Sequence, residues 1–142
     1  MLDRERILAK FDELEGDVGE LRQVVPASFA EYMDKLEKRR ACERLLQLSI
    51  QCMMDICALF VSGLRLGLPA EEDDIFEKLE SAKIISPNLS GMLKTMKGFR
   101  NFLVHEYGGI DNAIVYKMAS TRIEDFEAFK ARMVQALQEK GM

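Results

Sequence analysis

The sequence predicts an all-α protein in which residues 1–142 form a single domain, an up-and-down helical bundle of about five helices. Three observations support this fold class. Apolar residues recur at helical spacing over long stretches, helix-capping residues stand before those stretches, and strand-like alternation never lasts more than a few residues. With 48% apolar residues, a chain of this length can bury a substantial core.

The first half of the chain predicts two helices. The first covers about residues 2–23, where apolar positions keep helical spacing, and Pro26 closes this segment. Ser28 and Glu31 match a capping box, in which a hydroxyl and a carboxylate satisfy free backbone donors at a helix start. A second, long helix is therefore expected from this point to about Leu66.

The second half of this long helix is apolar almost all round, which is typical of a helix covered on several sides. Its most apolar window, 45–64, contains Gln47, Gln51 and Asp55, which would be costly in lipid, so we expect a buried core helix and no membrane span. With Arg44, these residues form a polar stripe that should face other polar groups. The segment also holds three cysteines without metal-ligand spacing, expected as small buried residues in a reducing compartment: Cys42, Cys52 and Cys57.

The second half of the chain begins with two further helix starts. The acidic run 70–74 (Ala-Glu-Glu-Asp-Asp) favours the positive end of a helix dipole. Ser86 and Pro87 read as the N-cap and first residue of a helix over about 87–106, because proline lacks a donor that would be unsatisfied there anyway. Gly108 and Gly109 end that helix.

Two more signals follow near the carboxyl end. Asp111 can cap a short helical turn through Tyr116, and Thr121 with Glu124 forms a second capping box that opens a last helix.

No secretory signal is apparent at the first residues, so a cytoplasmic location is expected. The net charge of −4 argues against a generally cationic nucleic-acid binder, so any RNA contact must be local.

Four residues within one short stretch point to phosphate chemistry: Arg100, Asn101, His105 and Tyr107. Arg100 is a permanent cation whose planar fork matches phosphate oxygens. His105 is the single histidine of the chain, and histidine can give and take a proton near neutral pH. Tyr107 adds a phenol hydroxyl. Together these groups suit phosphodiester cleavage or phosphate binding.

The helical positions of these residues add two expectations. Lys94 and Lys97 share the helix with Arg100, so a local cationic patch for an anionic backbone is predicted there. Asn101 and His105 are four apart and share a face, whereas Arg100 and His105 are five apart, a poor spacing for one face. We further hypothesise that Asp55 or Gln51 hydrogen-bonds Arg100 or Asn101 and fixes the site.

Taken together, these residues resemble a known family. Arg100-Asn-Phe-Leu-Val-His105 fits the R-x4-6-H signature of HEPN domains, and His105-Glu-Tyr107 fits the R-x4-H-x-Y form of the HepT-like toxins. The resemblance covers about residues 30–120 and includes further segments in order and spacing: Glu43–Gln47, Asp55-Ile, Ile85-Ser-Pro, Gly98–Asn101, Ile110-Asp and Val115-Tyr116.

The resemblance implies a homodimeric helical bundle with metal-independent ribonuclease activity and no cofactor. It implies that the motif lies at a dimer cleft. From the residues themselves we expect Arg100 and His105 to be catalytic. We also expect Asn101, Asp55 and Gln51 to support them, and Lys94 and Lys97 to bind RNA. The implied partner is a small nucleotidyltransferase antitoxin, which can transfer AMP to the motif tyrosine, here Tyr107. The Cys, His and carboxylate positions of the sequence give no metal triad.

Two other interpretations stay open at this point. The same helix can serve a non-catalytic module that binds a nucleotide or a nucleotidyltransferase, which the net charge of −4 mildly favours. Alternatively, Arg100 pairs with Asp55 simply to hold two helices together, and the polar stripe is an interhelical network of a structural dimer. A lone histidine near a helix end is more often structural than catalytic.

Overall fold

The computed structural model describes residues 1–105 and 109–141, and this part of the chain contains seven helices and no strand. They are α1 (Arg4–Val24), α2 (Phe29–Asp34), α3 (Leu36–Gly63), α4 (Glu72–Ser81), α5 (Pro87–His105), α6 (Asn112–Thr121) and α7 (Ile123–Lys140). The all-α prediction is confirmed, whereas the expected number of about five helices is too low.

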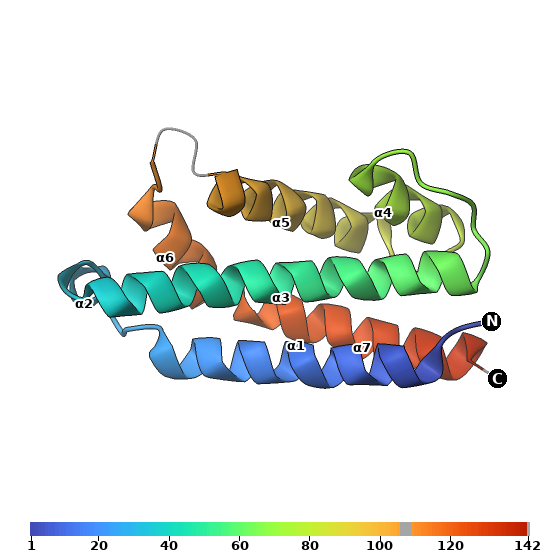
Figure 1. Ribbon diagram of the computed structural model, residues 1–142, viewed down its shortest axis with the longest axis horizontal. Helices are drawn as coiled ribbons and strands as arrows, with labels where there is room; N and C mark the ends of the chain where they lie inside the picture. Colours follow the sequence, from blue (N-terminus) through green and yellow to red (C-terminus); the bar gives the residue numbers. More distant parts are fainter. Residues whose placement is uncertain (106–108, 142) are drawn as a thin grey trace.

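Helix α3 forms the centre of the molecule (Figure 1). Helices α1 and α7 lie along one side of it, α5 and α4 lie along the other, and α2 and α6 meet at one end. The four long helices α1, α3, α5 and α7 alternate in direction, which is the expected up-and-down arrangement. Both described ends of the chain lie at the opposite end from α2 and α6.

The predicted long helix from Ser28 to Leu66 is two helices. The Ser28 cap is present, because its Oγ accepts from the Glu31 amide at 3.2 Å, but the chain is extended at Lys35 (φ −123°, ψ 107°). Residues 29–36 contain no glycine or proline that would predict this break. It lets α2 turn across the end of α3 and bury Tyr32, and the Arg39 guanidinium donates to the free carbonyl of Met33 at the end of α2.

The second predicted capping box, at Thr121, is wrong. Asp111 caps α6 as expected, accepting from the amides of residues 113 and 114, but α6 continues past Tyr116 through Thr121. The Thr121 hydroxyl donates to the Lys117 carbonyl inside α6, so it is not available as a cap. The residue at the N-cap of α7 is Arg122, without a side-chain cap bond.

The core lies on both sides of α3. This helix is long and apolar enough to cross a membrane. It contacts each of the other described helices of the bundle, however, as a core helix does. All three cysteines are buried and free, as predicted. Burial raises the pKa of Cys42 to about 11 and that of Cys52 to about 12, so these thiols stay protonated at neutral pH. At the end of α3, Gly63 is in close contact with Leu2, and a Cβ at Gly63 would lie 2.9 Å from the Leu2 Cα.

Candidate active site

Helix α5 carries the residues that the sequence singles out. It starts as predicted: the Ser86 Oγ accepts from the Leu89 amide at 3.1 Å, and Pro87 is the first helical residue. Its apolar residues pack inward against α3, including Leu93, Met96, Phe99 and Leu103. Three basic residues at three-residue spacing, Lys94, Lys97 and Arg100, lie along α5; we call these the basic row.

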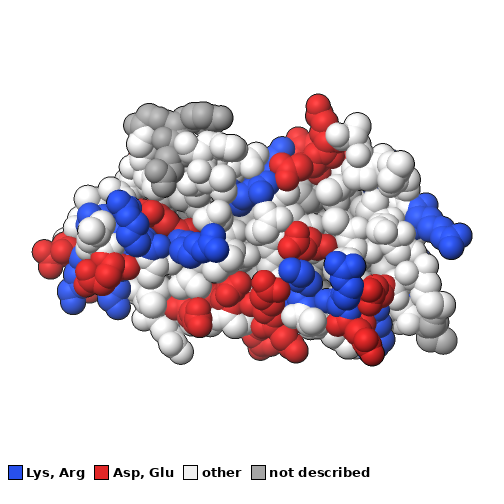
Figure 2. All heavy atoms as spheres, viewed as in Figure 1, with Lys and Arg blue, Asp and Glu red and all other residues white. Residues whose placement is uncertain are grey.

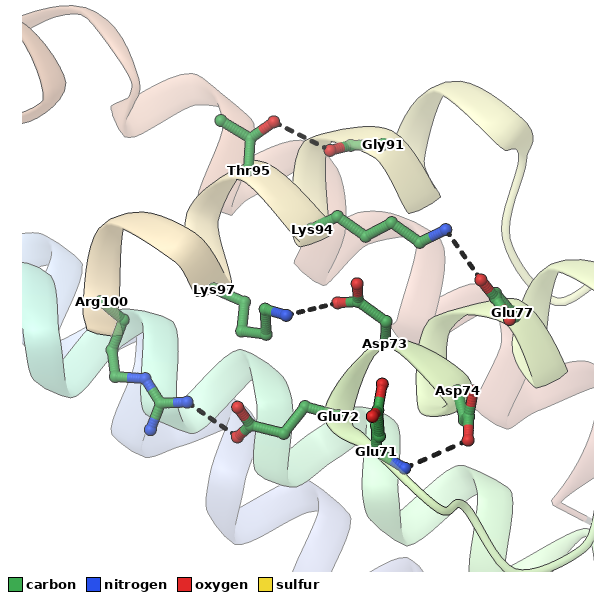
Figure 3. Close-up of polar contacts among 10 residues, drawn as sticks. All are labelled: Glu71, Glu72, Asp73, Asp74, Glu77, Gly91, Lys94, Thr95, Lys97 and Arg100. Atoms are coloured by element: carbon green, nitrogen blue, oxygen red, sulfur yellow. Dashed lines mark hydrogen bonds and ion pairs between the residues drawn. The ribbon is translucent and has the colours of Figure 1, made fainter. Parts of the chain in front are cut away.

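Each member of the basic row is paired with a carboxylate of α4 (Figure 3). The Arg100 Nη2 lies 2.7 Å from Glu72 Oε2, the Lys97 Nζ lies 2.6 Å from Asp73 Oδ1, and the Lys94 Nζ lies 3.3 Å from Glu77 Oε1. We call Glu72, Asp73 and Glu77 the acidic row. All three acids come from one helix and all three bases from the other.

The expected local cationic patch is thus paired with acidic side chains in this structure. Figure 2 shows acidic and basic side chains side by side where α4 meets α5, and both kinds of side chain along the lower edge of the same face. The basic row is present, but three carboxylates neutralise its three charges in this structure. Any polyanion that binds these bases must compete with the acidic row.

Arg100 is the most enclosed member of the basic row, with 13% of its side chain exposed. Its Nη1 donates to Gln51 Oε1 on α3 at 2.7 Å, and its Nη2 donates to Glu72 on α4. Its Nε is buried and has no hydrogen-bond partner among the described residues. Contacts to two helices, Gln51 of α3 and Glu72 of α4, thus hold the two terminal nitrogens of the guanidinium.

A chain of polar contacts continues from Arg100 across the bundle. Gln51 Nε2 donates to Asp55 Oδ1 at 2.9 Å, and Lys10 on α1 donates to Asp55 Oδ2 at 3.1 Å. Burial lowers the pKa of Lys10, but hydrogen bonds and charge attraction from Asp55 and Glu13 outweigh it, so the pKa is raised on balance. The hypothesised contact from the polar stripe to Arg100 is thus made by Gln51 directly, while Asp55 reaches Arg100 through Gln51.

The other motif residues are placed differently. Asn101 is half-buried on α5, and His105 is exposed at the end of that helix. Five residues of α-helix turn the chain by about 140° from Arg100, so the two side chains leave α5 in different directions. Tyr107 lies outside the described residues. Within residues 1–105 and 109–141, no group of three or more His, Cys, Asp or Glu side chains is arranged to hold a metal ion.

The acidic row was missed in the sequence, although a signal for it existed. The acidic run 70–74 was interpreted only as a favourable helix start. Asp74, which is not part of the acidic row, has this role, since its Oδ2 accepts from the amides of Ala70 and Glu71. However, α4 and α5 are joined by residues 82–86 only, so they must run antiparallel as neighbours. Acids with increasing residue numbers along α4 then face bases with decreasing residue numbers along α5. This is the observed pairing.

The chain has sequence relatives that are ribonucleases by name. It is 30% identical over 109 residues to a protein of Aphanizomenon flos-aquae named tRNA nuclease HepT, a match over 77% of this chain and 74% of that protein. It is 34% identical over 84 residues to a Shewanella oneidensis protein named mRNA nuclease HepT, a match over 59% of this chain and 63% of the relative.

Solved structures share the fold over nearly the whole chain. A tri-AMPylated HEPN toxin of Shewanella oneidensis, in complex with an MNT antitoxin, superimposes with a TM-score of 0.84 at 26% identity, over 96% of this chain and 99% of that one. A toxin–antitoxin complex with AMP-PNP gives a TM-score of 0.82 at 25% identity, over 92% and 97%. A family model described as "Ribonuclease HepT-like" matches residues 14–133. The chain therefore belongs to the HepT-like ribonuclease family.

Proposed function

We propose that this chain is the endoribonuclease toxin of a toxin–antitoxin pair and that it cleaves RNA without a metal ion or other cofactor. The observation that carries the proposal is the guanidinium of Arg100. It is held by Gln51 of α3, and it lies on α5, the helix that ends in the exposed His105. Family membership and the names of the relatives support RNA as the substrate class.

The reaction is an attack by the ribose 2′-oxygen on the adjacent phosphorus. The 2′-oxygen–phosphorus bond forms, the bond from phosphorus to the 5′-oxygen breaks, and a cyclic phosphate and a 5′-hydroxyl result. One imidazole takes the 2′-proton and another gives a proton to the leaving oxygen. Arg100 stabilises the charge that develops on the phosphate oxygens.

This mechanism needs two proton carriers, whereas each chain has one histidine. A two-fold homodimer supplies His105 and Arg100 from both copies to a common cleft. It also removes the difficulty that the two side chains leave α5 in different directions, because Arg100 of one copy then works with His105 of the other. Asn101 positions the substrate, and Lys94 and Lys97 bind its backbone.

The proposed partner is a minimal nucleotidyltransferase antitoxin. Related toxin structures contain an MNT antitoxin, and one of these toxins is tri-AMPylated. AMP on Tyr107 would bring a bulky anion near Arg100 and compete with RNA for this cation. The pair is expected to act in the cytoplasm, without a membrane.

The test is RNA degradation by the purified protein in EDTA. His105→Ala and Arg100→Ala should each lower the rate by about 10²–10⁴-fold, the usual contribution of acid–base or charge stabilisation, while the circular dichroism spectrum stays helical. Arg22→Ala is the matched control, because Arg22 also forms an ion pair, with Glu127, but between α1 and α7. Full activity of both site variants would exclude the assigned roles, and loss of the wild-type activity in EDTA would exclude metal independence.

A second candidate function has one specific observation in its favour. Because every member of the basic row is paired with a carboxylate, the described surface fits a module that binds an antitoxin or a nucleotide without cleaving RNA. Expression in cells separates the two functions. A toxin should arrest growth on its own and be relieved by the neighbouring gene, whereas a binding module should leave growth unchanged.

A further inference from the structure

In the ion pairs between α4 and α5, all acids belong to one helix and all bases to the other. This distribution needs an explanation. Three carboxylates of one helix cover three cations of the next, at 2.6 to 3.3 Å (Figure 3). An ion pair whose carboxylate is exposed contributes little to folding stability, because water already solvates that carboxylate. The side chains of Glu72, Asp73 and Glu77 are 45%, 40% and 58% exposed, so stability alone does not account for the row.

Helix α4 does not depend on these pairs for its position. Phe76 and Leu79, four and seven residues after Glu72, enter the core, each with no exposed surface. Asp74 caps its first turn. A carboxylate of the acidic row can therefore rotate away from its base into solvent while the helix stays where it is, and only side-chain torsions change.

We propose that the acidic row occupies the phosphate positions of the basic row and that RNA phosphates exchange with these carboxylates when substrate binds. The row thereby sets the affinity for RNA: a polyanion that brings several phosphates replaces several carboxylates together, whereas a single anion replaces only one. This inference rests on the proposed function, because it takes RNA as the polyanion.

Arg100 shows how the exchange leaves the site intact. When Glu72 releases the Nη2 donor, Gln51 still holds Nη1 at 2.7 Å, so the guanidinium keeps its direction. The freed donor is then available to a phosphate oxygen. Glu72 thus acts as an affinity-determining residue, and Gln51 as the positioning residue that remains in place.

The test compares two double variants that remove the same charge. Glu72→Gln with Glu77→Gln breaks two pairs of the acidic row, and Glu15→Gln with Glu127→Gln breaks the two pairs between α1 and α7. The probe is a fluorescent 2′-O-methyl oligoribonucleotide, which binds but cannot be cleaved because its 2′-oxygen is blocked. Cleavage of ordinary RNA is measured beside it, and Asp73→Asn serves as an independent single variant.

We expect the acidic-row variant to bind the probe about tenfold more tightly than wild type at low salt, equivalent to about 1.4 kcal/mol. The control variant should gain less than about twofold, and the difference should shrink as salt screens the charges. For cleavage, the gain should appear as a lower KM with an unchanged kcat. Asp73→Asn should tighten binding in the same direction.

Equal gains by the two double variants would overturn the inference, because net charge alone would then explain them. That failure is distinct from a failure of the proposed function. If the wild type does not cleave RNA but the acidic-row variant still binds the probe more tightly than the control, the ribonuclease proposal fails while phosphate exchange is supported. If the wild type cleaves RNA and the two variants bind alike, only the exchange is excluded.

Discussion

Two sets of ion pairs join neighbouring helices of this bundle, and the two sets distribute their acids and bases differently. Between α1 and α7, Glu15 pairs with Lys130 at 2.8 Å and Arg22 pairs with Glu127, so each helix contributes one acid and one base. Between α4 and α5, every acid is on α4 and every base is on α5. The first set flanks an apolar groove lined by Leu14, Val18, Phe126 and Val134.

This difference in charge distribution matters when the ion pairs open. When the α1–α7 pairs open, charges of both signs are uncovered on both helices, and no field of one sign results. When the α4–α5 pairs open, three cations are uncovered in a row on α5, which is the arrangement that attracts a polyanion. Charge segregation between these two adjacent helices is therefore the arrangement that the proposed phosphate exchange requires.

The largest expected effect tests what holds α4 in place. Phe76→Ala should lower the free energy of unfolding by about 3–5 kcal/mol, because it empties a fully buried site. Thermal or urea unfolding measures the loss, and Phe29→Ala, at a ring that is 42% exposed, is the control with a smaller expected loss. If Phe76→Ala cost no more than Phe29→Ala, the ion pairs and not the core would anchor α4.

A smaller effect is expected at the residue that orients Arg100. Gln51→Leu removes the acceptor of Arg100 Nη1 and should lower kcat for RNA cleavage by about tenfold with little change in KM, since geometry and not binding is lost. Gln51→Glu keeps an acceptor at this position and should retain more activity. Equal losses in the two variants would contradict the positioning role.

The smallest effect concerns the α1–α7 pairs. The hydrogen bond and charge of Lys130 lower the pKa of Glu15, so the pair stabilises the fold above the ordinary glutamate pKa of about 4.3 and loses this contribution as pH falls through the lowered value. In Lys130→Ala, an NMR titration should return the Glu15 pKa toward its ordinary value, while RNA cleavage is unchanged. A fall in cleavage would remove the contrast between the two sets of pairs.

Local patterns in the sequence predicted most of the helices. The Ser86-Pro87 start and the Asp111 cap are present because they depend on side chains next to the backbone groups that they satisfy. The break at Lys35 was not predictable in this way. It depends on Tyr32 entering the core beside Tyr116, whose ring centroid is 5.2 Å away, and no residue between 29 and 36 disfavours a helix strongly.

The candidate site was predicted in part for a similar reason. The polar stripe on an apolar helix predicted a partner for Gln51, because buried polar groups need one, and Arg100 is that partner. The partners of Lys94 and Lys97 depend on how two neighbouring helices lie side by side. Helical periodicity within α5 alone predicts the patch of bases but cannot supply their carboxylate partners.

The most direct test of the account is a double-mutant cycle between Arg100 and Glu72. Wild type, Arg100→Ala, Glu72→Gln and the double variant are compared for affinity toward the 2′-O-methyl oligoribonucleotide. The account predicts that Glu72→Gln tightens binding several-fold in the wild-type background and has almost no effect once Arg100 is absent. The same gain in both backgrounds would contradict it, because Glu72 would then repel RNA without occupying the phosphate position of Arg100.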